Sequence, residues 1–188
     1  MKQKSIFTIF AALTMVFGFA IGAIAQSDNA NILGKATVLQ AINVTGITSL
    51  EFGSVSPGLA KTIGLINDAT GGQVGEGTQT TGVFTVSAAA GSNVQVQFTT
   101  LPDSLVYATI NHLGIGTYTA GYHTAQPFTG GTTFTPGTGT QVASGNFPTN
   151  DIGGFNAIYV FIGGTVTPTS TQVSGAYEAN ITLTSIYN

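Results

Sequence analysis

The chain has 188 residues, a formal net charge of −3 and no cysteine, and only 6% of its residues are charged. There is no arginine, and two of the four lysines lie within the first four residues. So little positive charge cannot neutralise a run of phosphates, which excludes nucleic-acid binding. The lack of cysteine also excludes thiolate metal sites and thiol nucleophiles.

The first 25 residues are organised like a secretory signal peptide. Two lysines precede an apolar run over residues 6–24, which ends in the small-x-small pattern Ala23-Ile24-Ala25. The run is nearly long enough to span a bilayer, but no basic stop-transfer cluster follows it. We therefore expect cleavage after Ala25 on export through the periplasm to the cell surface. Residues 26–188 should then form a single domain without a membrane span.

Uncharged polar side chains take the place of charged ones along residues 26–188. A freely diffusing domain usually has about a quarter of its residues charged. A surface of Thr, Ser, Asn and Gln suits subunits that stack closely on copies of themselves. A simple secreted β-domain is equally compatible with this composition.

The pattern of apolar residues predicts an all-β chain of short strands, with Gly- and Thr-rich turns between them. The expected strands cover residues 36–44, 50–55, 62–67, 82–88, 94–100, 157–162, 165–167 and 175–188. Residues 82–88 and 94–100 flank Ala90-Gly91-Ser92-Asn93, which predicts a hairpin with Gly91 at positive φ. Residues 113–150 are weakly patterned, and we expect loose hairpins around 116–122 and 130–135.

The final expected strand has the longest alternation in the chain. Period two predicts that its odd-numbered residues face a core and its even-numbered residues face solvent. The inward set is Tyr177, Ala179, Ile181, Leu183, Ser185 and Tyr187.

This segment resembles the C-terminal signature of chaperone–usher pilins, in which a glycine opens an alternating strand that closes on a penultimate tyrosine. Gly175 and Tyr187 hold those two places here, and residues 50–55 look like an early strand of the same family. The chain is also similar to spore-coat U proteins and other bacterial pilin-like surface domains.

The resemblance implies an antiparallel immunoglobulin-like β-sandwich that lacks one strand. A periplasmic chaperone, and then a neighbouring subunit at an outer-membrane usher, would fill the resulting groove by β-strand addition. The partners would be copies of the chain or related subunits, in a pilus, fimbria or coat. The acceptor residues would be Gly175, Tyr177, Ile181, Leu183 and Tyr187.

The start of the mature chain has two interpretations. Ile32, Gly34, Ala36 and Val38 alternate and could form the donor strand for a neighbour. The same residues could begin the domain's own first strand, which we favour because only residues 26–50 precede the strand expected at 50–55. In that case the sandwich would be complete and the protein a coat or surface component.

No catalytic set is apparent in the sequence. His112 and His123 are the only histidines, and no carboxylate lies between Ser104 and Asn150. The seven acids are scattered, and no Gly-x-Ser-x-Gly nucleophile elbow occurs. We therefore expect no enzyme, no bound metal and no cofactor.

An exported, monomeric adhesin or glycan-binding module is the alternative function. Aromatic residues in and around the loop-rich middle of the chain could form a platform on which sugar rings stack. These residues are Tyr107, Tyr118, Tyr122, Phe128 and Phe134.

Overall fold

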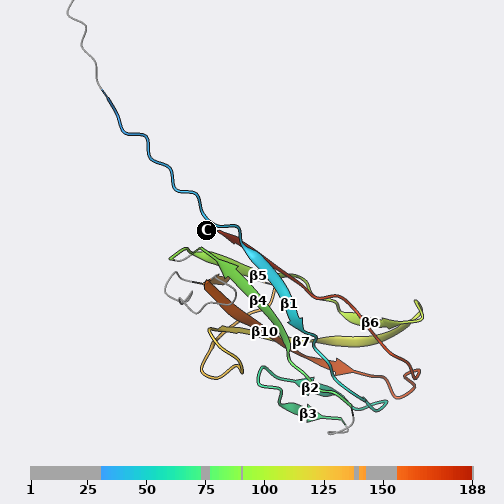
Figure 1. The fold of residues 1–188 in the computed structure, drawn as a ribbon. Helices are drawn as coiled ribbons and strands as arrows, with labels where there is room; N and C mark the ends of the chain where they lie inside the picture. The colour runs from blue at the N-terminus through green and yellow to red at the C-terminus, as the bar shows by residue number, and fades with distance from the viewer. Residues whose placement is uncertain (1–30, 73–76, 90, 138–139, 143–155, 188) are drawn as a thin grey trace, which may run out of the picture. The chain divides into compact units, whose positions relative to one another are not determined.

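The structure is a computed structural model that describes residues 31–72, 77–89, 91–137, 140–142 and 156–187 (Figure 1). The chain divides into two compact units, residues 1–38 and residues 39–188. In the first unit, residues 31–38 form no helix or strand and their side chains are exposed. All regular elements among the described residues are β-strands, which confirms the all-β prediction. No helix in these residues has the length and hydropathy to cross a membrane.

The larger sheet of residues 39–188 has eight strands in antiparallel pairing. Its main path runs through β1 (Asn43–Thr48), β4 (Gly82–Ala88), β10 (Asn156–Thr167), β2 (Lys61–Ile63) and β3 (Ala69–Gly71). The long strand β7 (Asn111–His123) also pairs with β10. It is followed outward by β6 (Ser104–Tyr107) and β8 (Thr132–Phe134).

The smaller sheet has three antiparallel strands in the order β11 (Thr182–Tyr187), β5 (Val94–Thr100) and β9 (Thr140–Val142). Valine, threonine and aromatic residues dominate these strands because branched and ring side chains pack well on a pleated surface. β11 pairs with β5 only, so its other edge has no strand partner among the described residues.

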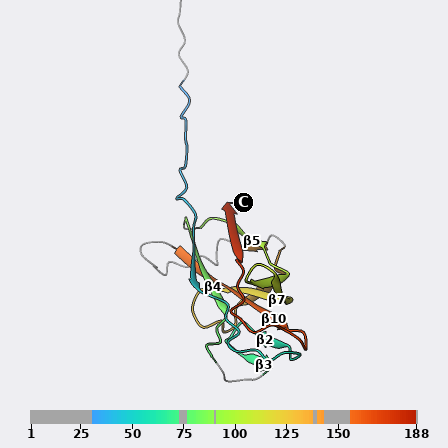
Figure 2. The same ribbon diagram turned by 90° about the vertical axis from the view of Figure 1, so that its right-hand side faces the viewer.

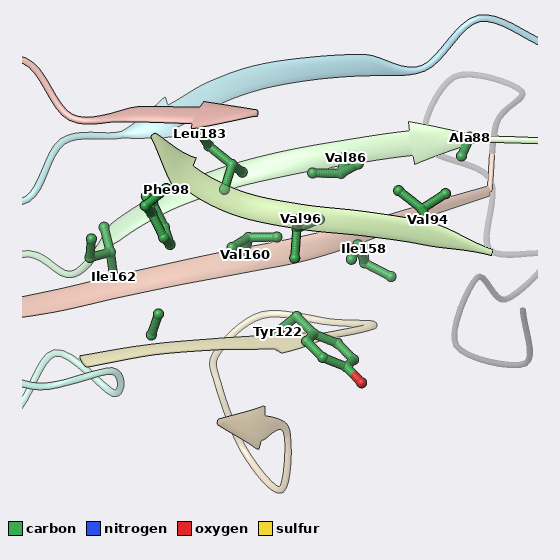
Figure 3. Packing of buried hydrophobic residues seen from close by; sticks show 11 residues of the cluster. Val86, Ala88, Val94, Val96, Phe98, Tyr122, Ile158, Val160, Ile162 and Leu183 are labelled. Atoms are coloured by element: carbon green, nitrogen blue, oxygen red, sulfur yellow. The ribbon is translucent and has the colours of Figure 1, made fainter. Parts of the chain in front are cut away.

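The main hydrophobic core lies between the two sheets (Figure 3). Val94, Val96 and Phe98 of β5 alternate inward and are almost completely buried. They meet Val86 of β4 and Val160 of β10 from the larger sheet. Burial of one such side chain contributes about 1.5–3 kcal/mol, so this cluster is the main source of stability.

The predicted hairpin between residues 82–88 and 94–100 is wrong, although both strands have the predicted bounds. β4 pairs with β1 and β10, whereas β5 pairs with β11 and β9. The connection around Gly91, at φ 69°, therefore leads from one sheet to the other. Alternation identifies which face of a strand is buried. Two strands that pair in one sheet and two strands that face each other across a core have the same alternation, so this pattern cannot tell the two arrangements apart.

Strand β7 was predicted only as a loose hairpin. Leu113 and Ile115 are buried on its first half, and Ala120 and Tyr122 on its second half, so the buried positions change from odd to even numbers. Thr117 lies between them with φ 47°, and the register with β10 shifts at the same place. This bulge breaks the period-two pattern.

Five other elements differ from the prediction. Residues 31–42 form no strand, so the favoured interpretation of residues 32–38 as the start of the first strand is wrong. Residues 50–55 form only one isolated bridge, between Glu51 and Thr80. The strand expected at 62–67 is shorter, because the chain turns at Asn67 with φ 60°. The last strand begins at Thr182 and not at Gly175. The two strands predicted at residues 157–162 and 165–167 form one continuous strand, β10.

Candidate functional site

A groove of about 1080 Å³ lies in the unit formed by residues 39–188. Its first flank is the segment that follows β1, residues 49–57, and its second flank is the segment that precedes β11, residues 172–181. The two strands β1 and β11 themselves run close together (Figures 1 and 2). Small-molecule sites usually enclose about 300–1,000 Å³, so the groove is large enough to accept several side chains of a peptide.

The floor of the groove is apolar. Leu113 and Ile115 of β7 and Val166 of β10 are buried there together with Phe52 of the first flank. Tyr177 of the second flank packs against the same cluster. These side chains form a second core cluster, separate from the one between the two sheets. A peptide in the groove would therefore bury apolar side chains against a surface that is already well packed.

Each flank uses one side of its backbone for pairing within the chain. Glu51 exchanges two backbone hydrogen bonds with Thr80, of 2.9 and 3.0 Å. Glu178 does the same with Val106 of β6, at 2.9 and 3.1 Å.

In an extended chain, successive N–H and C=O groups point to opposite sides of the strand. The backbone groups of Phe52 and of Tyr177 and Ala179 should thus point away from these bridges. They have no hydrogen-bond partner in the described part of the chain. The groove therefore combines an apolar floor with two strand edges that can donate and accept hydrogen bonds, which is the geometry needed for β-strand addition.

The acceptor residues expected from the sequence lie in two places. Gly175, Tyr177 and Ile181 line the groove. Leu183 and Tyr187 belong to β11 and pack into the main core opposite Phe98 and Val94.

Strand β11 has the predicted alternation within its own bounds. Leu183 is 7% exposed, whereas Ile186 on the other face is 52% exposed. Ser185 also faces inward, opposite Val96, and its Oγ is buried without a hydrogen-bond partner among the described residues. Ala179, predicted to be inward, is exposed because it lines the open groove.

Tyr187 has a role that the sequence pattern does not specify. Its hydroxyl donates a hydrogen bond to the Gln40 carbonyl and accepts one from the Ala89 N–H at 2.9 Å. It thereby joins the last strand to the residues before β1 and to the end of β4. Alternation indicates that Tyr187 faces inward, but not which groups its hydroxyl meets.

The possible donor residues lie in the unit formed by residues 1–38. Ile32 and Val38 are 95% and 94% exposed, and Ala36 is also exposed. A Cβ added at Gly34 would meet nothing within 4 Å. Their side chains are thus available to another molecule.

A polar cluster near β6 has the residue types of a hydrolase triad but not the arrangement. Ser104 Oγ lies 3.3 Å from His112 Nδ1 and 3.4 Å from Asp103 Oδ1. In a triad the carboxylate orients the imidazole, which in turn takes the serine proton. Here the carboxylate meets the hydroxyl, so nothing in this cluster orients His112 as a base. No group of three metal-ligating side chains occurs in the described ranges.

The aromatic residues considered for sugar stacking are largely used in packing. Tyr122 and Phe128 are 8% and 9% exposed and belong to two different core clusters. Tyr107 packs against Tyr177, with ring centroids 5.7 Å apart. The buried rings cannot stack on a sugar without unfolding part of the core.

The chain matches no protein-family model and no curated protein.

Proposed function

We propose that the chain is an exported structural subunit of a bacterial surface fibre or coat. Copies assemble when a β-strand of one copy enters the groove of the next. The main support is the groove itself, in which backbone groups without a partner among the described residues flank an apolar floor on both sides. Main-chain hydrogen bonds would supply affinity, and alternate side chains on the floor would supply specificity.

The strand order supports an immunoglobulin-like sandwich that lacks its last strand. In that fold one layer has the order A-B-E-D and the other C-F-G. The order β1-β4-β10-β7 corresponds to A-B-E-D, and β5 and β11 correspond to C and F. Strand G would pair with β11, whose second edge has no partner among the described strands.

Residues 31–38 supply the donor strand in this proposal. Their alternation places Ile32, Gly34, Ala36 and Val38 on one side of an extended strand. They form no strand within their own unit and expose their apolar side chains. A segment of this kind gains backbone hydrogen bonds and apolar contacts only by binding another chain.

A periplasmic chaperone and an outer-membrane usher are the partners that would support this mode of assembly in the cell. A subunit with an open apolar groove would otherwise aggregate after export. A chaperone strand in the groove would prevent this, and the usher would be the place where the neighbour's strand replaces it.

Deletion of residues 26–38 tests the proposed function. Because residues 31–38 form no part of the sheets, the shortened chain should keep its β-sheet circular dichroism spectrum and its protease resistance. Size-exclusion chromatography should show oligomers for residues 26–188 and monomers for the shortened chain. Gels of unheated and heated samples in detergent should show a ladder only for residues 26–188.

A single monomer peak for residues 26–188 at all concentrations would contradict subunit assembly. It would favour the monomeric adhesin or glycan-binding module. Unfolding of the shortened chain would instead mean that this segment belongs to the domain's own fold.

A further inference from the structure

We propose that Lys35 of the incoming strand lies between Glu51 and Glu178 of the neighbouring copy and sets the register of strand addition. The assignment rests on the proposed function and adds to it the charge pattern that aligns donor with groove. It concerns Lys35, one of only four cations in the chain, and two acids, one on each flank of the groove.

Lys35 is the lysine that a partner can reach in the described part of the chain. The other described lysine, Lys61, is completely buried and its Nζ donates a hydrogen bond of 2.9 Å to the Ser54 carbonyl. Lys35 is exposed, in the middle of residues 31–38. The donor segment therefore presents one positive charge.

Glu51 and Glu178 line the groove from opposite flanks, and both are exposed. Their side chains form no hydrogen bond or ion pair within the residues that the structure describes. The adjacent residues Phe52 and Tyr177 pack on the apolar floor. In locally extended backbone, alternation then places both glutamates on the outer face of the flanks.

The alternation of the donor places Lys35 on the same outer face. When Ile32, Gly34, Ala36 and Val38 face the floor, Lys35 faces outward between the two flanks. Directly opposite residues of neighbouring strands have Cβ atoms about 4.5–5.5 Å apart, and opposite charges at such positions attract. One lysine would thus meet a carboxylate on each side.

Other registers lose this arrangement. A shift by one residue would turn Lys35 toward the apolar floor, where its charge would be desolvated. A shift by two would place Leu33 or Thr37 between the glutamates and leave both carboxylates without a cation. The two acids therefore select one register among those that the apolar residues alone allow.

Charge reversal tests this assignment in chains of residues 26–188 that are refolded alone or together. One variant is Lys35→Glu, and the other is the double variant Glu51→Lys with Glu178→Lys. Each alone should give at least about tenfold less detergent-resistant ladder than the unaltered chain, since like charges then oppose each other at two cross-strand pairs. An equal mixture should recover the ladder, because each donor then meets a groove of opposite charge.

Two controls separate this effect from net charge and misfolding. Asp68→Lys changes the charge by +2, which is the size of the change in Lys35→Glu with the opposite sign; it lies at an exposed site outside the groove and should leave the ladder unchanged. In 1 M salt, where the Debye length is about 3 Å, the defect of Lys35→Glu should shrink. Circular dichroism should be the same for all variants, because the altered side chains are exposed.

If the unaltered chain forms ladders and Lys35→Glu forms them equally well, the register assignment is wrong while the proposed function stands. A mixture that does no better than either variant alone also overturns the assignment. If the unaltered chain forms no ladder, the proposed function fails and the assignment with it.

Discussion

The side chain of Tyr187 lies one position from the end of the chain, where residues are usually frayed. Here its ring packs on the main core and its hydroxyl joins Gln40 to Ala89. We expect Tyr187→Phe to lower the free energy of unfolding by about 1 kcal/mol, through loss of these hydrogen bonds. Tyr187→Ala should cost about 2 kcal/mol or more, since the packing of the ring is also lost.

Urea denaturation of residues 26–188 measures both effects. Ile186→Ala is the matched control, because that side chain points outward and is 52% exposed; it should change the free energy of unfolding by less than about 0.5 kcal/mol. Equal losses at positions 186 and 187 would contradict the strand register.

Tyr118 makes the stability of the fold depend on pH in the alkaline range. Burial, with a smaller contribution from the charge of Asp103, raises the pKa of Tyr118 to about 12 from its ordinary value of 10.0. Its hydroxyl donates a hydrogen bond of 2.6 Å to the Pro102 carbonyl. Because the folded-state pKa is the higher one, the neutral form stabilises the fold below pH 10, and this contribution is lost as the pH rises from 10 to 12.

Thermal unfolding followed between pH 9 and 12 should therefore show a smaller loss of stability for Tyr118→Phe than for the unaltered chain. Tyr107→Phe is the comparison, at a tyrosine on the neighbouring strand β6 that is 36% exposed. Identical pH profiles for Tyr118→Phe and the unaltered chain would disprove this role of Tyr118.

Strand β7 shows how one residue at a bulge changes an element. Thr117 has φ 47°, a conformation that is costly for a β-branched residue and free of cost for glycine. We expect Thr117→Gly to leave stability unchanged or raise it by up to about 1 kcal/mol. Thr119→Gly, two residues further along the same strand, should lower stability, since ordinary strand geometry favours threonine.

Chemical denaturation compares these two substitutions on the same exposed face of β7. A destabilising effect of Thr117→Gly as large as that of Thr119→Gly would mean that β7 has no bulge at this position.

The elements differ in how far their sequence determines them. β4 and β5 could be predicted to the residue because both are runs of apolar and β-branched residues between turn signals, and in β5 a strict alternation of apolar and polar side chains also reports one buried face. Their assignment to different sheets could not, because alternation contains no information on pairing. β7 was missed because the bulge at Thr117 moves its buried positions from odd to even numbers.

The candidate site was partly predictable in the same sense. Gly175 and Tyr177 were selected from the alternation and the resemblance, and both line the groove. The first flank was expected as a regular strand, but residues 50–55 form only the bridge at Glu51. Glu51 and Glu178 pair with segments far along the chain, and their neighbours' backbone groups have no partner in the part of the chain that the structure describes. Such long-range contacts leave no local pattern in the sequence.

At the scale of the whole molecule, the two sheets and the core between them account for stability. The groove is a separate surface where a further β-strand can bind. The main core includes residues from β4, β5, β7, β10 and β11, all of which belong to the unit formed by residues 39–188. The fold can therefore be stable while one surface stays open to another chain. Few charged side chains oppose close contact between copies, since charged residues make up 6% of the sequence.

Hydrogen–deuterium exchange of assembled and monomeric protein tests strand addition most directly. Backbone amides of residues 31–38 should exchange freely in the monomer, where they form no strand, and slowly in the assembly. Protection should appear at the same time in residues 49–57 and 172–181, the two flanks of the groove. Residues 31–38 that still exchange freely in the assembled protein would contradict the account.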